Sequence, residues 1–518
     1  ENWVYKSIAW LAPGYERCLV KLSRGGTDAS VHREFDALAK RFVEGGFVLP
    51  EAKSGVAWLD RDTLLVVTNW GDGSLTASGY PRVAKRWKRG TPLAKAETVF
   101  EGRREDIGIW PRVLDSGGAT LPMIDQSLTF YTGAYHLIGG GGKLRRLPLP
   151  ESVDLAGFYA GRILFTLRDA WEVAGRTFPE GALLAIDAAA FRESGELPSI
   201  ETVYTPDDRT SIEGVTVSRS GLYVSLLQNV KGSILRFDVE AKSGEWRAEP
   251  LPLPPSGTVS LSAANPHSGT VFVNYEDHIT PDRLSEYDAG ANALTRLKAL
   301  PARFRADGLQ VSQHTVRSAD GETVPYFVIH RKGLKPDGST PTILYGYGGF
   351  EISLKPSYSA TIGKLWLERG GAYAVANIRG GGEFGPRWHK AALKTNRQRA
   401  YDDFIAVAED LTKRGITSPK RLGISGGSNG GLLVGAIFTQ RPDLMNAVVC
   451  RVPLLDMMRY TKLLAGASWA TEYGDPEDPK MRAALLKYSP YQNMFPGRKY
   501  PKVFIETSTK DDRVHPGH

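Results

Sequence analysis

The stretch Gly426-Gly427-Ser428-Asn429-Gly430-Gly431 decides how the second half of this 518-residue sequence folds. It contains the pattern G-x-S-x-G. A short apolar run, 421–425, precedes it, and apolar residues at helical spacing follow it. The pattern therefore predicts a strand, a sharp turn and a helix in that order. Glycines are needed on both sides of the serine because larger side chains would collide in so tight a turn.

A strand, turn and helix of this kind form the nucleophile elbow of α/β-hydrolases, which presents a serine hydroxyl at the end of a sheet. The N-terminus of the following helix places positive potential where an oxyanion develops. A lone match to the pattern would be weak evidence, but here an apolar strand precedes the motif and a helical pattern follows it. We therefore predict that Ser428 is a catalytic nucleophile.

Strand and helix patterns alternate on both sides of this turn from about residue 310 onward, which is typical of an α/β domain. Strands are predicted at residues 342–345, 373–378, 421–425, 447–450 and 503–506, and helices at 399–414 and from Asn429. Asp511 follows the last of these strands. Because the acid of a hydrolase triad stands on a loop after a strand downstream of the serine, Asp511 is predicted as that acid. A solvated acidic turn is the alternative.

The general base is the missing part of this triad. Only His515 and His518 follow Asp511, and both are too close to it to reach the serine from the opposite side of the acid. His389 comes before the serine, in the wrong order for this fold. We therefore expect the catalytic histidine beyond residue 518, and we interpret the sequence as a fragment that lacks both termini.

The first 300 residues have a different character, with short β-branched and aromatic runs between glycine-rich turns. Examples are the runs at residues 18–22, 63–68, 162–167, 221–227 and 270–275. Repeated small sheets favour a β-propeller, and about six blades of 40–50 residues fit the length. An array of β-sandwiches is the alternative. The segment 301–308 is predicted as the linker between the two parts.

Composition excludes several classes of protein. Hydrophobic residues make up 42% and charged residues 24%, as in soluble globular chains. No apolar run is long enough to span a membrane. The two cysteines cannot form a disulfide scaffold or a four-cysteine zinc site, and we expect free thiols. The net charge of +8 comes from interspersed residues, which favours a solvated surface over nucleic-acid binding.

One glycine-rich motif points to a competing function. Residues 380–385 match G-x-G-x-x-G after a predicted strand, and Asp402 follows about 20 residues later, as a dinucleotide site requires. However, Pro386 and Trp388 do not open a convincing amphipathic helix, and Asp402 begins a helical pattern instead of ending a second strand. Dinucleotide binding is therefore disfavoured.

Two aromatic segments have the chemistry of a site. Tyr345–Phe350 is a glycine-rich loop after a strand, from which a tyrosine hydroxyl could donate into an oxyanion hole. Trp469 and Tyr473 lie in an excursion between two strands, where pockets are commonly built. Packed aromatic core positions are the alternative for both segments.

Together these segments resemble the prolyl oligopeptidase family of serine peptidases. The segments that carry the resemblance are residues 345–350, 377–383, 418–422, 426–431, 441–444 and 511–514. The resemblance covers residues 310–518 and implies a β-propeller, seven-bladed when complete, followed by an α/β-hydrolase domain. The implied boundaries are 1–308 for the propeller and 309–518 for the catalytic domain, each incomplete at its outer end.

The resemblance also implies roles for particular residues. The Tyr347 hydroxyl and the Asn429 backbone N–H would form the oxyanion hole, and Trp469 would stack on a proline ring of the substrate. Arg513 would donate a hydrogen bond to a peptide carbonyl. The same pocket would be lined by Phe350, Leu454, Tyr473 and Val514. Asn429 after the serine matches the branch of the family that cleaves after proline.

The implied function is a serine endopeptidase that hydrolyses short peptides on the carboxyl side of proline through an acyl-enzyme. Neither a metal nor an organic cofactor is expected, and proline-containing peptides are the expected partners, without nucleic acid or membrane. We expect a monomer in the cytoplasm, with the periplasm as the alternative compartment. The competing functions are a broader peptidase or esterase of the same fold and a non-catalytic propeller scaffold.

Overall fold

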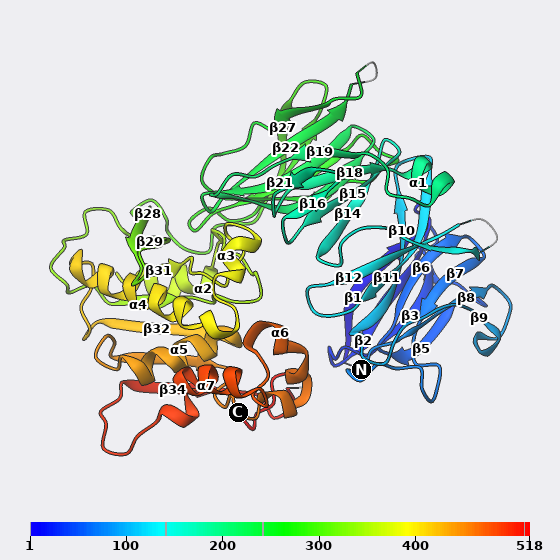
Figure 1. The fold of residues 1–518 in the computed structure, drawn as a ribbon. Coiled ribbons are helices and arrows are strands. Elements are labelled where there is room, and N and C mark those ends of the chain that lie inside the picture. Colours follow the sequence, from blue (N-terminus) through cyan, green and yellow to red (C-terminus); the bar gives the residue numbers. More distant parts are fainter. Residues whose placement is uncertain (1, 140–141, 241–242, 512) are drawn as a thin grey trace. The chain divides into compact units, whose positions relative to one another are not determined.

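The computed structural model describes residues 2–139, 142–240, 243–511 and 513–518 (Figure 1). The chain forms two compact units. The first unit comprises Glu1–Tyr204 with Val217–Arg219 and Asn265–Ser268, and the second comprises Thr205–Thr216, Ser220–Ala264 and Gly269–His518. The predicted boundary at residues 308 and 309 remains a prediction.

Four antiparallel sheets, taken in chain order, build the first unit. The first sheet contains β1 (Trp3–Trp10), β2 (Arg17–Arg24), β3 (Ser30–Asp36), β4 (Arg41–Phe42) and β5 (Val48–Ala52). The second contains β6 (Gly55–Asp60), β7 (Thr63–Val67), β8 (Val83–Lys88) and β9 (Glu97–Glu101). The third contains β10 (Gly108–Asp115), β11 (Thr120–Ser127), β12 (Gly133–Ile138) and β13 (Leu144–Arg146). The fourth contains β14 (Val153–Tyr159), β15 (Arg162–Leu167), β18 (Leu183–Asp187) and β19 (Ile200–Tyr204), with a hairpin of β16 (Trp171–Val173) and β17 (Arg176–Phe178) and the helix α1 (Ala188–Ser194).

Two more sheets of the same kind come next along the chain, and most of their residues belong to the second unit. One contains β20 (Thr210–Ser218), β21 (Gly221–Gln228), β22 (Lys231–Val239) and β23 (Trp246–Pro250). The other contains β24 (Thr258–Ala263), β25 (Val271–Glu276), β26 (Arg283–Asp288) and β27 (Ala293–Ala299). Consecutive strands pair as neighbours within each sheet, as in the blades of a propeller.

The sequence pattern of these sheets explains how they pack. In β15 and β18, the alternate residues Ile163, Phe165, Leu184 and Ile186 are 0% exposed and share one apolar cluster. The residues between them are buried too, because both faces of these strands are covered.

The seven blades expected from the family resemblance are not found, since the described residues form six such sheets. At about 50 residues per sheet, residues 1–299 hold six. This number agrees with the estimate from the strand pattern alone.

A seven-stranded sheet is the centre of the second unit, in the order β28-β29-β31-β30-β32-β33-β34. Its strands are β28 (Leu309–Arg317), β29 (Thr323–Arg331), β30 (Thr342–Tyr345), β31 (Ala372–Ala376), β32 (Leu422–Gly427), β33 (Ala447–Arg451) and β34 (Lys502–Glu506). The strands from β31 to β34 are parallel, whereas β28 and β29 form an antiparallel hairpin at one edge. Sequence analysis missed this hairpin.

Helices α4 (Gln398–Lys413) and α5 (Asn429–Gln440) pack against this sheet (Figure 1). Ala400, Phe404 and Val407 form the buried face of α4, which confirms the predicted helical spacing. The shorter helices are α2 (Ala360–Ile362), α3 (Pro386–Lys390), α6 (Ala470–Tyr473) and α7 (Pro479–Tyr488). Single turns of 3-10 helix span Leu93–Lys95, Lys394–Asn396, Tyr460–Lys462 and Tyr491–Asn493, a six-residue 3-10 helix spans Leu464–Trp469, and a π-helical turn spans Gly363–Leu367.

The strands predicted around the serine are confirmed, with one shift. The strand expected at 373–378 ends at Ala376, and the following residue, Asn377, turns its side-chain amide to the Leu354 carbonyl at 2.6 Å. The G-x-G-x-x-G segment after it leads into α3, a helix of only five residues. This short helix does not provide the long helix N-terminus that a dinucleotide site uses.

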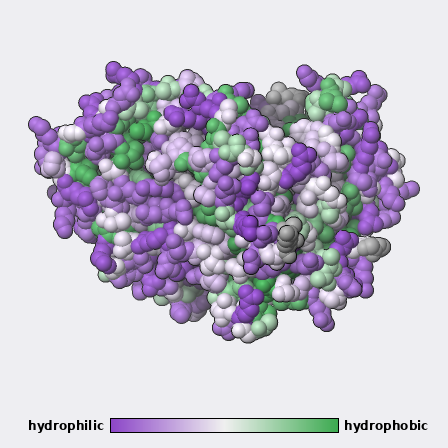
Figure 2. All heavy atoms as spheres, turned by 90° about the horizontal axis from the view of Figure 1, so that it is seen from above, coloured by the Kyte–Doolittle hydropathy of each residue, from purple (hydrophilic) through white to green (hydrophobic). Residues whose placement is uncertain are grey.

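The surface and the helices agree with a chain that packs its apolar residues inward. Figure 2 shows hydrophilic residues over most of the displayed face, with hydrophobic residues in smaller groups. Among the described residues, every helix is too short or too polar to cross a lipid bilayer. Cys18 and Cys450 are buried free thiols. In the same residues, no group of three or more His, Cys, Asp or Glu side chains is placed to hold a metal ion.

Candidate active site

Ser428 occupies the turn between β32 and α5 in a strained backbone conformation, with φ of +57° and ψ of −118°. Its N–H donates to the Arg451 carbonyl at 2.9 Å, which ties the turn to the neighbouring strand β33. A Cβ atom on Gly426 would lie 2.2 Å from the Gly430 carbonyl oxygen, so no side chain fits there. The turn has the geometry predicted for a nucleophile elbow.

The loop after β30 meets the serine because β30 and β32 are parallel neighbours, with Tyr345 opposite Ser425. The Ser428 side chain lies close enough to the Tyr347 hydroxyl to lower the pKa of this phenol, against the larger effect of burial. Burial raises the pKa of Tyr347, so the phenol stays protonated at neutral pH and remains a donor. Asn429 is the first residue of α5, and its backbone N–H belongs to the helix N-terminus beside the serine. Both predicted oxyanion donors therefore adjoin Ser428.

Most of the predicted pocket residues belong to the large apolar cluster that forms the core of the second unit. Leu454, Trp469, Tyr473 and Val514 belong to the buried core of the second unit, and Phe350 packs against it. The rings of Phe350 and Tyr473 meet edge to face, with centroids 5.7 Å apart. Trp469 keeps 8% of its surface exposed, whereas Tyr473 keeps none. The cluster thus joins the loop after β30, the segment before α7 and the segment after β34.

Asp511 lies in the exposed segment after β34. Its Oδ1 accepts hydrogen bonds from the backbone N–H groups of Arg513 and Val514 at 3.0 and 2.8 Å. Val514 is buried and anchors the end of this turn in the apolar cluster, whereas Arg513 is exposed. The carboxylate is therefore oriented by its own loop.

The histidines near the chain's last residues are engaged locally. His515 Nδ1 accepts a hydrogen bond from the Gly517 N–H at 2.8 Å, and His518 Nδ1 accepts one from the Asp456 N–H at 3.4 Å. His389, which comes before the serine in the sequence, is 1% exposed, and its Nε2 lies 2.8 Å from Glu472 Oε2. That none of these three histidines is the general base stays a prediction.

Sequence analysis missed two charged residues behind the site, Arg397 and Glu472. Both are 0% exposed, and Arg397 Nη1 lies 2.9 Å from Glu472 Oε1. Burial alone would lower the pKa of Arg397, but the surrounding Tyr401 and Glu472 raise it, and the net shift is upward. Arg397 follows Lys394 and precedes Arg399 in the sequence, so it resembles one of several solvated charges at the start of a helix. Nothing in its sequence context marks it as buried.

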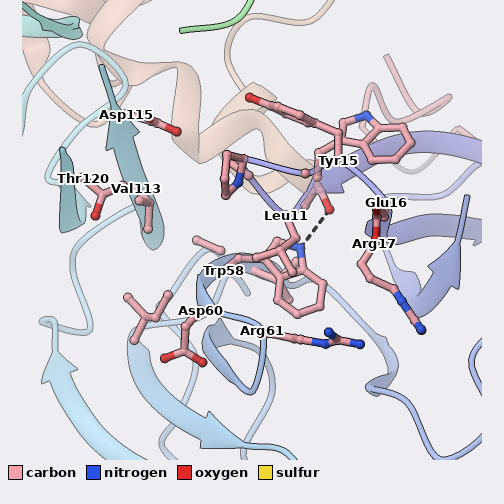
Figure 3. A pocket seen from close by; sticks show the side chains of 18 of the residues that line it. Leu11, Tyr15, Glu16, Arg17, Trp58, Asp60, Arg61, Val113, Asp115 and Thr120 are labelled. Atoms are coloured by element: carbon pink, nitrogen blue, oxygen red, sulfur yellow. Dashed lines mark hydrogen bonds between the residues drawn. The ribbon is translucent and has the colours of Figure 1, made fainter. Parts of the chain in front are cut away.

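A separate cavity of about 940 Å³ lies within the first unit. Figure 3 shows Asp115 and Thr120 on one side of it and Tyr15 and Arg17 on the other, with Trp58 between them. The side chains come from the β1–β2 connection and from strands of the first three sheets. None of the predicted site residues is among the described residues that line it.

Comparison with known proteins gives matches in both units. The prolyl oligopeptidase family matches residues 356–518, and the N-terminal β-propeller domain of prolyl oligopeptidase matches residues 169–299. An uncharacterized peptidase of Sinorhizobium fredii, y4nA, is 45% identical over 531 residues, which cover 100% of this chain and 72% of that protein. A prolyl endopeptidase of Elizabethkingia miricola is 40% identical over 309 residues, which cover 59% of this chain and 43% of that enzyme.

A solved structure is similar over the whole chain. The structure of a post-proline cleaving enzyme from Rickettsia typhi superimposes with a TM-score of 0.94 at 33% sequence identity, covering 100% of this chain and 76% of that one. The similarity therefore extends over the six blade-like sheets as well as the seven-stranded sheet.

Proposed function

This chain belongs to the prolyl oligopeptidase family of serine peptidases, and we propose that the protein hydrolyses short peptides on the carboxyl side of proline. Ser428 is the proposed nucleophile and Asp511 the proposed triad acid. The observation that carries the substrate class is the edge-to-face contact of Phe350 with Tyr473, whose hydroxyl donates to Asn429 beside Ser428, in the same apolar core that contains Trp469.

The chemistry follows from the groups around the serine. Ser428 Oγ attacks the peptide carbonyl, and its proton passes to a histidine base, which we assign to none of the described residues. As the carbonyl carbon becomes tetrahedral, its oxygen takes up negative charge. The Tyr347 hydroxyl and the Asn429 N–H donate to that oxygen, which stabilises the transition state more than the ground state. Asp511 orients the histidine and stabilises its protonated form.

The pocket favours proline for two reasons. A pyrrolidine ring is compact, apolar and already constrained, so it loses little entropy when it packs on the face of Trp469. The core that would receive it contains aromatic and aliphatic side chains, and the buried carboxylate that accepts the Phe350 N–H, Glu472, is paired with Arg397. Glu472 is therefore already engaged and is a poor counter-ion for a basic substrate side chain. The names of the relatives from Elizabethkingia and Rickettsia, both enzymes that act at proline, also support this specificity.

The test is a comparison of kcat/KM on fluorogenic peptides that differ only in ending with Pro, Ala or Arg, using the full-length protein. We expect Pro to exceed Ala by about 100-fold, which equals about 2.7 kcal/mol of transition-state discrimination. Replacing Trp469 by Ala should lower that ratio by about tenfold, and Trp469→Phe should retain most of it because a flat ring remains. Activity with no preference for Pro would support a broader peptidase or esterase and would overturn the proposed specificity.

A further inference from the structure

The Arg397–Glu472 ion pair touches both loops that surround Ser428. The Arg397 guanidinium donates through Nη2 to the side-chain oxygen of Asn429, the residue whose backbone N–H is a proposed oxyanion donor. Glu472 Oε1 accepts the Phe350 N–H at 3.0 Å, three residues after Tyr347, which supplies the other donor. One buried guanidinium–carboxylate pair thus holds the loop after β30 and the start of α5 at the same time.

Asn429 closes the connection between these two loops directly. Its Nδ2 donates to the Tyr347 carbonyl at 2.6 Å, and its Oδ1 also accepts the Tyr473 hydroxyl at 2.8 Å. The fit is tight, because a Cβ atom on Gly349 would lie 2.5 Å from Asn429 Nδ2. The Asn429 side chain therefore has its orientation set by three hydrogen bonds, and its position depends on Arg397.

Full burial of two charges is costly unless each is paired and hydrogen-bonded. Here Glu472 is bound by Arg397, by the Phe350 N–H and, through Oε2, by His389 Nε2 at 2.8 Å. Arg397 also lies over the Tyr473 ring, with its Cζ 5.3 Å from the ring centroid. An apolar pair could fill this space, but it could not bind the Asn429 side chain and the Phe350 N–H together. The ion pair therefore supplies the contacts that hold the Asn429 side chain and the loop after β30 in place.

We propose that Arg397 and Glu472 are positioning residues that set the geometry of the Tyr347 and Asn429 oxyanion donors relative to Ser428. The inference rests on the proposed function, because it takes these two donors as the oxyanion hole. Neither charged side chain touches the reacting atoms, so their effect passes through Asn429 and the loop after β30. The contribution belongs to the transition state, in which the oxyanion exists, more than to substrate binding.

A second buried ion pair in the same unit provides a matched control. Arg379 Nη2 lies 2.7 Å from Asp403 Oδ1, with side-chain exposures of 4% and 0%. The other side-chain partners of Arg379 are Asp320 and Ser318. Removing one charge here perturbs a second buried pair, whose side chains bind neither Asn429 nor the Phe350 N–H.

The experiment compares Arg397→Met, Arg397→Lys and Asp403→Asn in the full-length protein. For each, we would measure the rate of labelling by a fluorophosphonate per folded molecule, and the inhibition constants of a proline-terminated peptide aldehyde and of the matching acid product. The aldehyde forms a tetrahedral adduct with an oxyanion, whereas the product does not. We expect Arg397→Met to slow labelling and weaken aldehyde binding by about 10²-fold, with product binding within about threefold of wild type.

Arg397→Lys should retain more labelling and aldehyde binding than Arg397→Met, because the positive charge remains. It should stay below wild type, because an ammonium group cannot bind Glu472 and Asn429 through two separate nitrogens as the guanidinium does. Asp403→Asn should lower the melting temperature while leaving the labelling rate per folded molecule unchanged. Unchanged labelling in Arg397→Met, or equal weakening of aldehyde and product, would overturn the proposal. Fluorophosphonate labelling does not depend on proline in the substrate. If the protein showed no preference for proline peptides, the proposed specificity would fail, but the labelling rates of the Arg397 variants would still test the positioning role.

Discussion

Ser428 and Asp511 follow two strands of the same parallel sheet, but the structure holds them in different ways. The serine side is fixed by long-range contacts: the Ser428 N–H binds the Arg451 carbonyl, and Asn429 binds the loop that carries Tyr347. The acid side is fixed locally, by backbone N–H groups two and three residues after Asp511. The first arrangement is buried, and the second is largely exposed.

This difference shows where preorganisation resides in the described residues. The proposed nucleophile and the proposed oxyanion donors have their positions set by the sheet, the helix α5 and the buried ion pair, before any substrate binds. The acid has its carboxylate oriented, but its loop depends on Val514 for an anchor in the core. Substitutions on the serine side should therefore change catalysis through many partners, whereas those on the acid side should act through charge.

The largest effect is expected from removing the nucleophile. Ser428→Ala should lower kcat by about 10⁶-fold, because the acyl-enzyme can no longer form. The measurement is turnover of a fluorogenic proline peptide, with Ser425→Ala on the same strand as the control. Residual turnover within tenfold of wild type in Ser428→Ala would place the nucleophile elsewhere.

Asp511→Asn separates charge from loop geometry on the acid side. Asparagine keeps an oxygen that can accept the Arg513 and Val514 N–H groups, so the turn should persist. The loss of negative charge should lower kcat by about 10⁴-fold, since the histidine is then neither oriented nor stabilised when protonated. Steady-state kinetics with a matched thermal melt would show this as a catalytic loss without a stability loss. A variant that melts early and keeps its kcat would refute the triad role.

Tyr347→Phe removes one oxyanion donor and leaves the other. We expect kcat to fall by about 10²–10³-fold with little change in KM, because the hydroxyl acts on charge that develops only in the transition state. The phenylalanine ring fills the same space, so the variant also tests whether packing alone suffices. A rise in KM at constant kcat would assign Tyr347 to substrate binding instead.

Glu383 offers a smaller, pH-dependent test of the serine side. This buried carboxyl accepts the Leu354 N–H at 2.9 Å and the Asn377 side-chain amide at 3.2 Å. Burial raises the pKa of Glu383 to about 7 from 4.5, so the folded state holds a proton that the unfolded state releases over that interval. The stability that the neutral carboxyl contributes is present below pH 4.5 and is lost as the pH rises through 7.

Glu383→Gln keeps a neutral group in this position at every pH. Relative to the variant, wild type should lose up to about 3 kcal/mol of unfolding free energy between pH 4.5 and pH 8. Urea unfolding of both proteins at the two pH values gives their unfolding free energies. The change with pH in the difference between the two proteins isolates Glu383, because the other titrating groups are the same in both. An equal gap between the proteins at both pH values would contradict a raised pKa.

The same contrast explains what the sequence could predict. The serine turn was predictable because its signal is local: glycines at fixed offsets, a strand before them and a helix after them. The family resemblance also implied roles for Tyr347, Phe350 and Tyr473, which stay predictions, although Phe350 and Tyr473 are in ring contact. The number of sheets followed from strand spacing, while the expected seventh was not found in the described residues.

What the sequence could not predict are partners set by tertiary contacts. Arg397 and Glu472 are separated by 75 residues and meet only because the segment before α4 and the helix α6 are brought together behind the serine. Glu472 sits between two aromatic pocket residues, yet nothing in that position says that it will be buried with an arginine. The hairpin of β28 and β29 was missed for a related reason, because its burial depends on the strand β31 beside it.

The most direct test of the central claim is to map the residue that reacts with a fluorophosphonate in the full-length protein, with and without a proline-terminated peptide aldehyde. We expect a single adduct on the peptide that contains Ser428, and its loss when the aldehyde is present. An adduct on another residue, or labelling of Ser428 that the aldehyde does not prevent, would contradict it.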